Sequence, residues 1–508
     1  MNHNTTTPAE GRETTLDMSE DIWQEFATKT QDLVKNYLAN ISTRPVFPQT
    51  SAGEFAGLIP SDLPEQNASI DEIVETCRSI FEGSRHTGHP RYFGYVASSA
   101  SPVGAIADFI ASALNQNLTA WRSSPAAAEL EWMVVRWLGS LVGYGKNSFG
   151  LLTSGASMAN LNALYIAHRA KAPQASSKGL WTTGKPMTVY ASDQVHMSIA
   201  KAADVLGLGR DQVRLVKTDQ RYRLDVEDLC ERLAEDTENG FEPFAVIGSA
   251  GTVNTGAVDP LREIASVAAD YNLWFHIDGA YGAFGAADPQ SRGLFSGLDL
   301  ADSLSLDPHK WLYAPIDCGC LLLRDPARAR LAFAHGEAEY IKVYEESEKE
   351  AFAFWDYGIE LTRRFRALKV WMILSYYGAR HIRNVITEDV SLAKYLGERI
   401  EASRDFELLT PVELSICCFR YVPPEWRARL SKATAGERKE LTISLNELNE
   451  KLMYRVQRGG QAYLSSAVLR GEFALRVCIV NFRTTRADLD KTLDILREAA
   501  ATIESHSG

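Results

Sequence analysis

The 508-residue sequence lacks several features that mark particular classes of protein. No stretch approaches ~18 uncharged apolar residues, which excludes a membrane-spanning helix, and the polar N-terminus, MNHNTTTPAEGRETTLDMSEDIWQEF, has no apolar core of a signal peptide. Clusters of Lys and Arg are absent and the net charge is −12, which argues against a surface for nucleic acid or anionic membrane. We therefore expect a cytoplasmic protein whose partners are small molecules or a second copy of itself.

The cysteines also lack the patterns of a metal site. They form no CxxC pair and no His-Cys cluster with zinc spacing, so we expect no metal. They fit small buried apolar residues in a reducing compartment. The seven cysteines are Cys77, Cys230, Cys318, Cys320, Cys417, Cys418 and Cys478.

The composition, 45% hydrophobic and 23% charged, is that of a globular protein with room for two or three domains. We expect an N-terminal helical arm over residues 1–100, a large domain over 101–394 and a small α+β domain over 395–508. Within the arm, an amphipathic pattern predicts a helix from Asp21 to about Leu38, and Ser69 is placed to cap the start of another. Whether the arm packs on a partner subunit or on its own domain stays open.

The centre of the chain alternates short apolar runs with helical patterns. MTVYAS precedes SIAKAADVLGL, and FAVIGSAG precedes LREIASVAADYN. This alternation predicts an α/β fold with a mostly parallel sheet covered by helices on both faces. Long helices are expected near IELTRRFRALKVWMILSYYG and DVSLAKYLGERIEASR. In such folds ligands bind beyond the carboxyl ends of the strands, so we expect the catalytic and binding residues in the loops there.

Three strand-end loops carry polar groups that are weak signals when taken alone. TSGASMANL places Ala156 and Ser157 at a helix start, where free N–H groups favour an anion such as phosphate. SDQVHMSIAKAA places His196 at another helix start, and GSAGTVNTGAVDP offers Thr252. Each loop also has a purely structural explanation: a helix cap for Ala156 and Ser157, a structural histidine for His196 and a turn for Thr252.

Two further loops are more specific. In LWFHIDGAYGAF a buried strand ends in Asp278, followed closely by Ala280, and in SLSLDPHKW another strand leads to Lys310. An aspartate can pair with the pyridinium nitrogen of pyridoxal phosphate, and a partly desolvated lysine can form a Schiff base with its aldehyde. A phosphate cradle, a ring-stacking histidine, this aspartate and this lysine together meet the separate requirements of one cofactor.

The order and spacing of TSGASMANL, SDQVHMSIAKAA, HIDGAYG, DPHKW and RRFRALKVW resemble the group II pyridoxal-phosphate-dependent amino acid decarboxylases, which have fold type I and include the aromatic L-amino acid decarboxylases. The likeness runs from GHPRYFGY to NFRTT. It implies that Lys310 is the Schiff-base lysine, that Asp278 partners the ring nitrogen, and that His196 and Ala280 lie on opposite ring faces. It also implies that the following residues line the phosphate and cofactor pocket: Ala156, Ser157, Thr252, Asp307 and His309. Since a carboxylate beside a phosphate is repulsive, we expect Asp307 to contact backbone or hydroxyl donors.

The resemblance implies a homodimeric enzyme that converts an L-amino acid, with an aromatic one favoured, into an amine and CO2. In these enzymes a loop tyrosine ahead of RRFRALK reprotonates the carbanion, and ungapped alignment puts Phe354 there. In plant relatives phenylalanine at this position accompanies aldehyde synthases, which consume O2 and release aldehyde, ammonia, CO2 and peroxide. A small gap would instead bring Tyr340, Tyr344 or Tyr357 to the position, so both products stay open.

The family's side-chain pocket crosses the dimer and includes the segment NQNLTAWRSS. Here Asn117 and Thr119 stand where the catechol-specific enzymes are apolar, which favours a substrate carrying a hydroxyl or a heteroatom. Tyr92, Phe93 and Trp121 keep aromatic character, either as substrate contacts or as packing. An aminotransferase of the same fold is the other enzyme class considered, but it needs an arginine clamp for a second carboxylate substrate, and DPHKW is not its usual lysine context.

Overall fold

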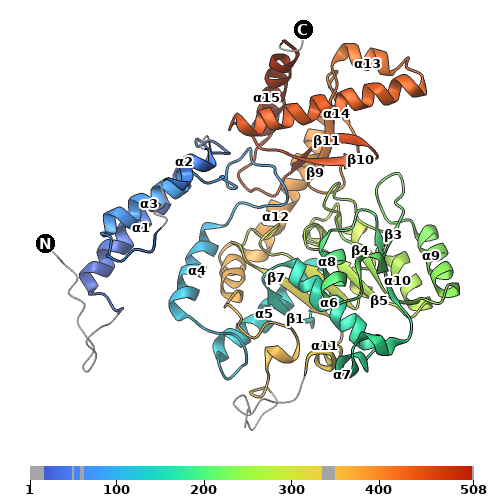
Figure 1. The fold of residues 1–508 in the computed structure, drawn as a ribbon. Coiled ribbons are helices and arrows are strands. Elements are labelled where there is room, and N and C mark those ends of the chain that lie inside the picture. Colours follow the sequence, from blue (N-terminus) through green and yellow to red (C-terminus); the bar gives the residue numbers. More distant parts are fainter. Residues whose placement is uncertain (1–15, 49–50, 58–61, 335–348, 506–508) are drawn as a thin grey trace.

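The computed structural model describes residues 16–48, 51–57, 62–334 and 349–505. A large α/β domain and a smaller α+β domain pack together, and an N-terminal helical arm extends away from them (Figure 1). In the described part of the chain no helix is both long enough and apolar enough to cross a bilayer.

The large domain is built, across the described residues, on a seven-stranded sheet with the order β1-β7-β6-β5-β4-β2-β3. Strand β7 pairs antiparallel with β1 and β6, and the other neighbouring strands run parallel. The predicted α/β fold with a mostly parallel sheet is therefore confirmed. The strands are β1 (Phe149–Thr153), β2 (Met187–Ser192), β3 (Val213–Val216), β4 (Glu242–Ser249), β5 (Trp274–Asp278), β6 (Ser303–Leu306) and β7 (Gly319–Leu323).

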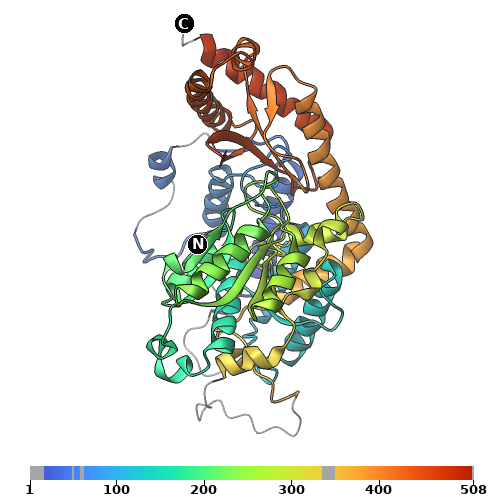
Figure 2. The same ribbon diagram turned by 90° about the vertical axis from the view of Figure 1, so that its right-hand side faces the viewer.

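Helices cover both faces of this sheet (Figure 2). Because successive side chains of a strand point to opposite faces, Val246 and Ile247 of β4 belong to two different hydrophobic cores. The core around Ile247 includes α6 (Ala156–Lys171), α8 (Ser198–Val205) and α11 (Pro326–Phe333). The core around Val246 includes α5 (Pro125–Val142), α9 (Val226–Glu238), α10 (Leu261–Asp270) and α12 (Ala367–Glu401). Burial on both faces explains the continuous apolar strand sequences.

The small domain holds an antiparallel sheet with the order β10-β11-β9-β8, covered on one face by helices (Figure 1). Its apolar core brings the end of α12 together with two helices from the C-terminal part of the chain. Its strands and helices are β8 (Phe406–Leu408), β9 (Ile416–Tyr421), α13 (Pro424–Leu430), α14 (Ala435–Arg458), β10 (Ser465–Leu469), β11 (Glu472–Cys478) and α15 (Arg486–Ser505).

The two long helices expected between the domains form one element, α12, whose backbone leaves the helical region at Gly378, with φ 78° and ψ 146°. Glycine tolerates this left-handed φ without a steric cost, so the helix bends there. Ile373 packs in the large-domain core and Leu396 in the small-domain core. The expected domain boundary at residue 395 therefore falls inside a helix that both domains share.

The N-terminal arm contains α1 (Glu20–Ala39), α2 (Ala52–Ala56) and α3 (Ile70–Glu82), and it leads to α4 (Pro102–Leu114). The predicted cap is present, because Ser69 and Glu72 form a reciprocal capping box. Trp23 of α1 stacks on Phe109 of α4 with ring centroids 6.4 Å apart, so the arm contacts its own large domain. Large apolar side chains nevertheless stay exposed on the arm and on α4: Trp23, Ile73, Ile80, Ile106, Phe109, Ile110 and Leu114.

Gly319, the first residue of β7, lies against the backbone of Gly155 at the start of α6. A side chain at position 319 would place its Cβ 2.5 Å from Gly155 Cα, so only glycine fits. This close approach joins the loop after β1 to the loop after β6.

Strand β3 and helix α9 were not expected from the sequence, since VRLV is too short to show a clear period.

Candidate active site

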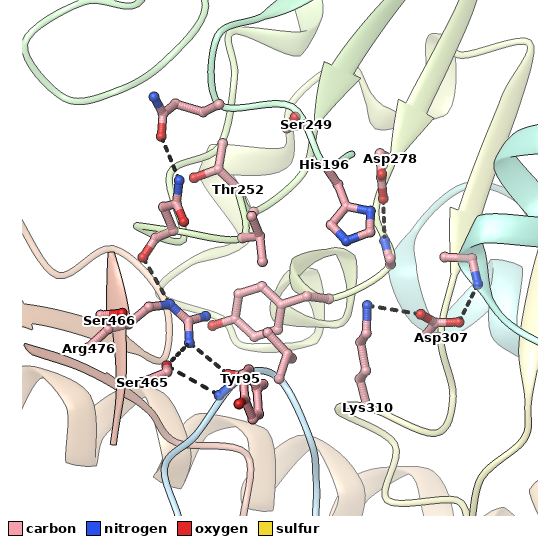
Figure 3. Close-up of a pocket in the computed structure, with 18 of the residues that line it drawn as sticks. Tyr95, His196, Ser249, Thr252, Asp278, Asp307, Lys310, Ser465, Ser466 and Arg476 are labelled. Atoms are coloured by element: carbon pink, nitrogen blue, oxygen red, sulfur yellow. Dashed lines mark hydrogen bonds and ion pairs between the residues drawn. The ribbon is translucent and has the colours of Figure 1, made fainter. Parts of the chain in front are cut away.

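The loops after five strands of the large sheet meet the small domain around one cavity of about 800 Å³ (Figure 3). It lies at the carboxyl ends of the parallel strands, where the fold rule places ligands. The predicted cofactor residues that line it are Ala156, Ser157, His196, Thr252, Asp278, Ala280, Asp307, His309 and Lys310. The structure thus brings together every residue that the sequence assigned to the cofactor.

Lys310 presents its amine to this cavity from the loop after β6. Its Nζ lies 2.9 Å from Asp307 Oδ2, and its side chain is 23% exposed. The backbone N–H of Lys310 donates to the carbonyl of Asp307, which closes a turn that holds the two side chains on the same side. The lysine is therefore a partly buried amine with a fixed ionic partner, as Figure 3 shows.

Asp307 connects the lysine to the start of α6. Its Oδ1 accepts a hydrogen bond of 2.7 Å from the backbone N–H of Ala156 at the start of α6. This confirms the expectation that Asp307 contacts a backbone donor. His309 Nε2 lies 3.7 Å from Asp307 Oδ2, and burial lowers the pKa of His309 below its usual value.

Asp278 ends β5 as a buried carboxylate. It accepts hydrogen bonds from the backbone N–H of Ala280 (3.1 Å), from Asn160 Nδ2 (2.9 Å) and from Ser305 Oγ (3.4 Å). Among the residues that the structure describes, no Lys, Arg or His makes an ion pair with it. A buried carboxylate that faces a cavity with neutral donors alone is a strong acceptor for a cationic ligand group.

His196 lies at the start of the segment that leads into α8, beside Asp278 and Lys310 in Figure 3. Its Nδ1 is 2.9 Å from Ser198 Oγ and accepts the backbone N–H of Ser198 at 3.2 Å. Burial lowers the pKa of His196, although Asp278 opposes this shift, so the ring is neutral near pH 7. A neutral, fixed imidazole suits the expected stacking on an aromatic ring.

These groups fit pyridoxal phosphate, and the Asp307 carboxylate is already paired with the Lys310 amine and the Ala156 N–H. The helix start at Ser157 offers a backbone and a hydroxyl donor for a phosphate, and Thr252 offers a further hydroxyl on the cavity wall. Asp278 offers an acceptor for a protonated ring nitrogen, and Lys310 offers an amine for the aldehyde. Once bound, the cofactor supplies an electron-accepting ring that lowers the cost of breaking a bond at the α-carbon of an amino acid.

Several lining residues were missed in the sequence: Tyr95, Tyr454, Tyr463, Ser465, Ser466 and Arg476. Most of them come from the small domain, which closes the cavity opposite Lys310 (Figure 3). Arg476 on β11 donates from Nη1 to the Tyr95 carbonyl (2.7 Å) and to Ser465 Oγ (3.1 Å), and from Nε to the Asn254 carbonyl (3.1 Å). Its Nη2 is buried without a hydrogen-bond partner.

The residues predicted for the substrate pocket do not line this cavity. Tyr92 and Phe93 are 1% and 0% exposed, and Tyr92 packs on Tyr463 with ring centroids 5.4 Å apart. They are core residues, and Tyr95 reaches the cavity in their place.

Asn117, Thr119 and Trp121 follow α4, away from the cavity of their own subunit. Asn117 Oδ1 accepts the backbone N–H of Arg363, and Trp121 Nε1 donates to Glu129. Within one chain the side chains of Asn117 and Trp121 therefore have structural partners.

Phe354 is also absent from this cavity. The residue is 1% exposed and packs in the large-domain core, where the Arg363 guanidinium lies 4.1 Å from its ring centroid. Tyr357 stacks on Phe352 and lies beside a different cavity. Tyr340 and Tyr344 fall outside the described residues. The placement of Phe354 facing the reacting carbon is therefore not supported within one subunit.

This fold and this site define a pyridoxal-phosphate-dependent α/β enzyme, and the comparisons agree. Residues 52–422 match the family model described as the pyridoxal-dependent decarboxylase conserved domain. The chain belongs to this family and is a carboxy-lyase.

Three relatives show the range of the family. An aromatic-L-amino-acid decarboxylase of Bacillus atrophaeus is 34% identical over 97% of this chain and 98% of its own. A 4-hydroxyphenylacetaldehyde synthase of Rhodiola rosea is 31% identical over 95% of this chain and 96% of its own. The crystal structure of Oryza sativa TDC with PLP and tryptamine is similar with a TM-score of 0.87 and 28% identity, covering 96% of this chain and 100% of that one.

Proposed function

We propose that this enzyme decarboxylates an aromatic L-amino acid and releases the corresponding amine. The observation that carries the proposal is the unpartnered Nη2 of Arg476, which is buried beside a cavity that also holds Lys310. A buried guanidinium N–H without a partner costs free energy, and a substrate carboxylate would satisfy it. An amino acid brings that carboxylate together with an amine for the cofactor.

The lining beside Arg476 favours an aromatic side chain. Tyr95, Tyr281, Tyr454 and Tyr463 contribute phenol rings, and Met453 contributes a thioether that suits contact with a ring. The names of relatives in both product classes also refer to aromatic substrates. Tyr95 and Tyr463 hydroxyls lie 3.3 Å apart, which leaves polar groups for a substrate hydroxyl or heteroatom.

The amine is the proposed product, because the argument for an aldehyde rested on phenylalanine at the proton-donor position. Phe354 lies in the core of its own subunit, so its position does not support the view that the enzyme lacks a proton donor. The aldehyde remains the alternative product. Decarboxylation to the amine consumes one proton, whereas the oxidative route consumes O2 and water and releases aldehyde, ammonia, CO2 and peroxide.

The test is incubation of the PLP-loaded enzyme in air with tyrosine, tryptophan, phenylalanine and dopa, with amine, aldehyde and peroxide assayed together. Amine and CO2 in equal amounts without peroxide is the expected result. Aldehyde with stoichiometric peroxide would replace the proposed product with the alternative, and no release of CO2 from any aromatic substrate would overturn the substrate class.

We also propose a homodimer in the cytoplasm. Ile106 and Phe109 of α4 are 56% and 60% exposed, which leaves an apolar surface that a second copy would cover. Asn117, Thr119 and Trp121 follow this helix directly, so a dimer formed through α4 would carry them toward the partner's cavity. The seven cysteines are free thiols, as a reducing compartment requires.

Sedimentation velocity tests the dimer. Phe109→Asp is expected to produce monomers of reduced activity, whereas Val205→Asp, which changes another exposed apolar residue at the end of α8, leaves the dimer intact. A wild-type monomer with full activity would refute the assembly.

A further inference from the structure

Behind the cavity, Asn160 of α6 contacts Asp278 directly and is connected to His196 through Ser198. It is fully buried, and its Nδ2 donates to Asp278 Oδ2 at 2.9 Å and to Ser198 Oγ at 3.0 Å. Ser198 Oγ lies in turn 2.9 Å from His196 Nδ1. One side chain therefore connects Asp278 with His196.

The orientation of the Asn160 amide follows from the charge on Asp278. If the amide were turned over, its oxygen would lie against the carboxylate, which is repulsive, so Nδ2 must face Asp278. The amide oxygen then faces His276 Nε2 at 3.0 Å, which must be the donor. His276 is fully buried and burial lowers its pKa to about 4, so it is neutral and its Nδ1 is an acceptor.

The far end of the network agrees with this orientation. Trp274 Nε1, which can only donate, lies 2.8 Å from Ser303 Oγ. The hydroxyl hydrogen of Ser303 is thereby left for His276 Nδ1, also at 2.8 Å. Every donor from Trp274 to Asp278 has one acceptor, and the network admits one arrangement of hydrogens.

The same reasoning fixes the tautomer of His196. Its Nδ1 accepts the backbone N–H of Ser198, so it carries no hydrogen. The hydroxyl of Ser198 accepts from Asn160 and donates to the same Nδ1. A neutral His196 therefore holds its hydrogen on Nε2, the ring nitrogen that the network leaves for the cavity.

We propose that Asn160 is the positioning residue of the cofactor pocket: it fixes Asp278 as a charged acceptor for the ring nitrogen and, through Ser198, fixes His196 with its hydrogen on Nε2. Without the amide, Asp278 loses a donor and turns more freely, and its pairing with the ring nitrogen weakens. His196 loses the donor that orders the Ser198 hydroxyl.

The test compares Asn160→Leu with Asn162→Leu. Both asparagines are buried on α6 and neither lines the cavity, but Asn162 Nδ2 has no hydrogen-bond partner. Titration of the apo-proteins with PLP is expected to show an affinity at least ~10-fold weaker for Asn160→Leu, which leaves a buried charge under-satisfied, and an unchanged affinity for Asn162→Leu. Equal affinities for the two variants would overturn the proposal.

A second readout follows the hydrogen directly. In apo-protein labelled with ¹⁵N-histidine, the His196 signals, assigned by comparison with His196→Gln, are expected to show hydrogen on Nε2 in the wild type and a mixture of tautomers in Asn160→Leu. Hydrogen on Nδ1 in the wild type would contradict the assignment. If Asn160→Leu does not fold, Asn160→Ser and Asn162→Ser, which remove similar volumes, serve as the pair.

Discussion

Lys310 Nζ lies 2.9 Å from Asp307 Oδ2, and the other oxygen of that carboxylate accepts the backbone N–H of Ala156. The position of the lysine is thus fixed relative to the start of α6, where the phosphate of the cofactor would lie. One carboxylate sets the distance between the two ends of the cofactor site.

Lys310→Ala and Lys310→Arg are both expected to abolish turnover, because neither side chain can form the covalent link to PLP. Lys310→Arg keeps a cation beside Asp307, so its stability should stay closer to that of the wild type. Borohydride reduction followed by peptide mapping should find PLP on Lys310 in the wild type and on neither variant. Turnover at the wild-type rate in either one would remove the basis of the mechanism.

Arg476→Lys is expected to raise the substrate KM by at least ~10-fold with a smaller change in kcat, because lysine cannot keep the contacts to Tyr95, Ser465 and Asn254 while offering a further N–H. The control is Arg470→Lys. Arg470 lies at the tip of the same hairpin and bonds Gln220 and Asp219 away from the cavity. Equal KM values for Arg476→Lys and the wild type would exclude substrate binding by Arg476.

Asp389 of α12 is expected to make stability depend on pH. It accepts hydrogen bonds from Trp311 and Tyr313, next to Lys310, and burial raises its pKa to about 7. The folded protein therefore keeps a proton that the unfolded chain, with a pKa near 3.9, has released. The free energy of unfolding should fall as pH rises between these two values, by at most about 1.4 kcal/mol for each pH unit.

Asp389→Asn removes this titration. Urea denaturation at a series of pH values from 5 to 8 should show the variant gaining stability relative to the wild type as the pH rises. Parallel curves for the two proteins would show that Asp389 does not titrate in this range.

Arg363 and Glu131 form a buried ion pair, with side chains that are 1% and 0% exposed. Arg363→Met should lower the free energy of unfolding by about 3–5 kcal/mol, because it leaves the Glu131 charge buried without a cationic partner. Arg364→Met, which removes a 44% exposed arginine paired with Asp108, should cost at most about 1 kcal/mol. Urea denaturation measures both, and the double variant Arg363→Met/Glu131→Leu should recover much of the loss.

The cofactor half of the site was predictable because strand ends can be read from local sequence. The apolar runs before Asp278 and Lys310 mark buried strands, and parallel strands bring the residues that follow them to one edge of the sheet. The capping box at Ser69 is equally local. These features depend on residues that are close together in the sequence, so one sequence is enough to predict them.

The substrate half depended on contacts between distant segments. Arg476 sits in an ordinary strand pattern, FALRVC, and nothing local indicates that its guanidinium reaches Asn254 and Tyr95. Tyr95 has a left-handed backbone, with φ 57°, which is uncommon for a bulky residue and redirects the chain just after Tyr92 and Phe93. Of the two roles left open for Tyr92 and Phe93, the structure shows packing, and Tyr95, which the sequence did not single out, lines the cavity.

The contact between Gly319 and Gly155 has a consequence for attempts to change what this enzyme accepts. Gly319 does not line the cavity, yet a methyl group there would push apart the loop that carries Lys310 and the helix start proposed to hold the phosphate. In libraries that vary the chain at random, substitutions of Gly319 should be as rare among active variants as substitutions of Lys310. Substitutions intended to change the substrate are better placed on the opposite wall of the cavity, which the small domain forms.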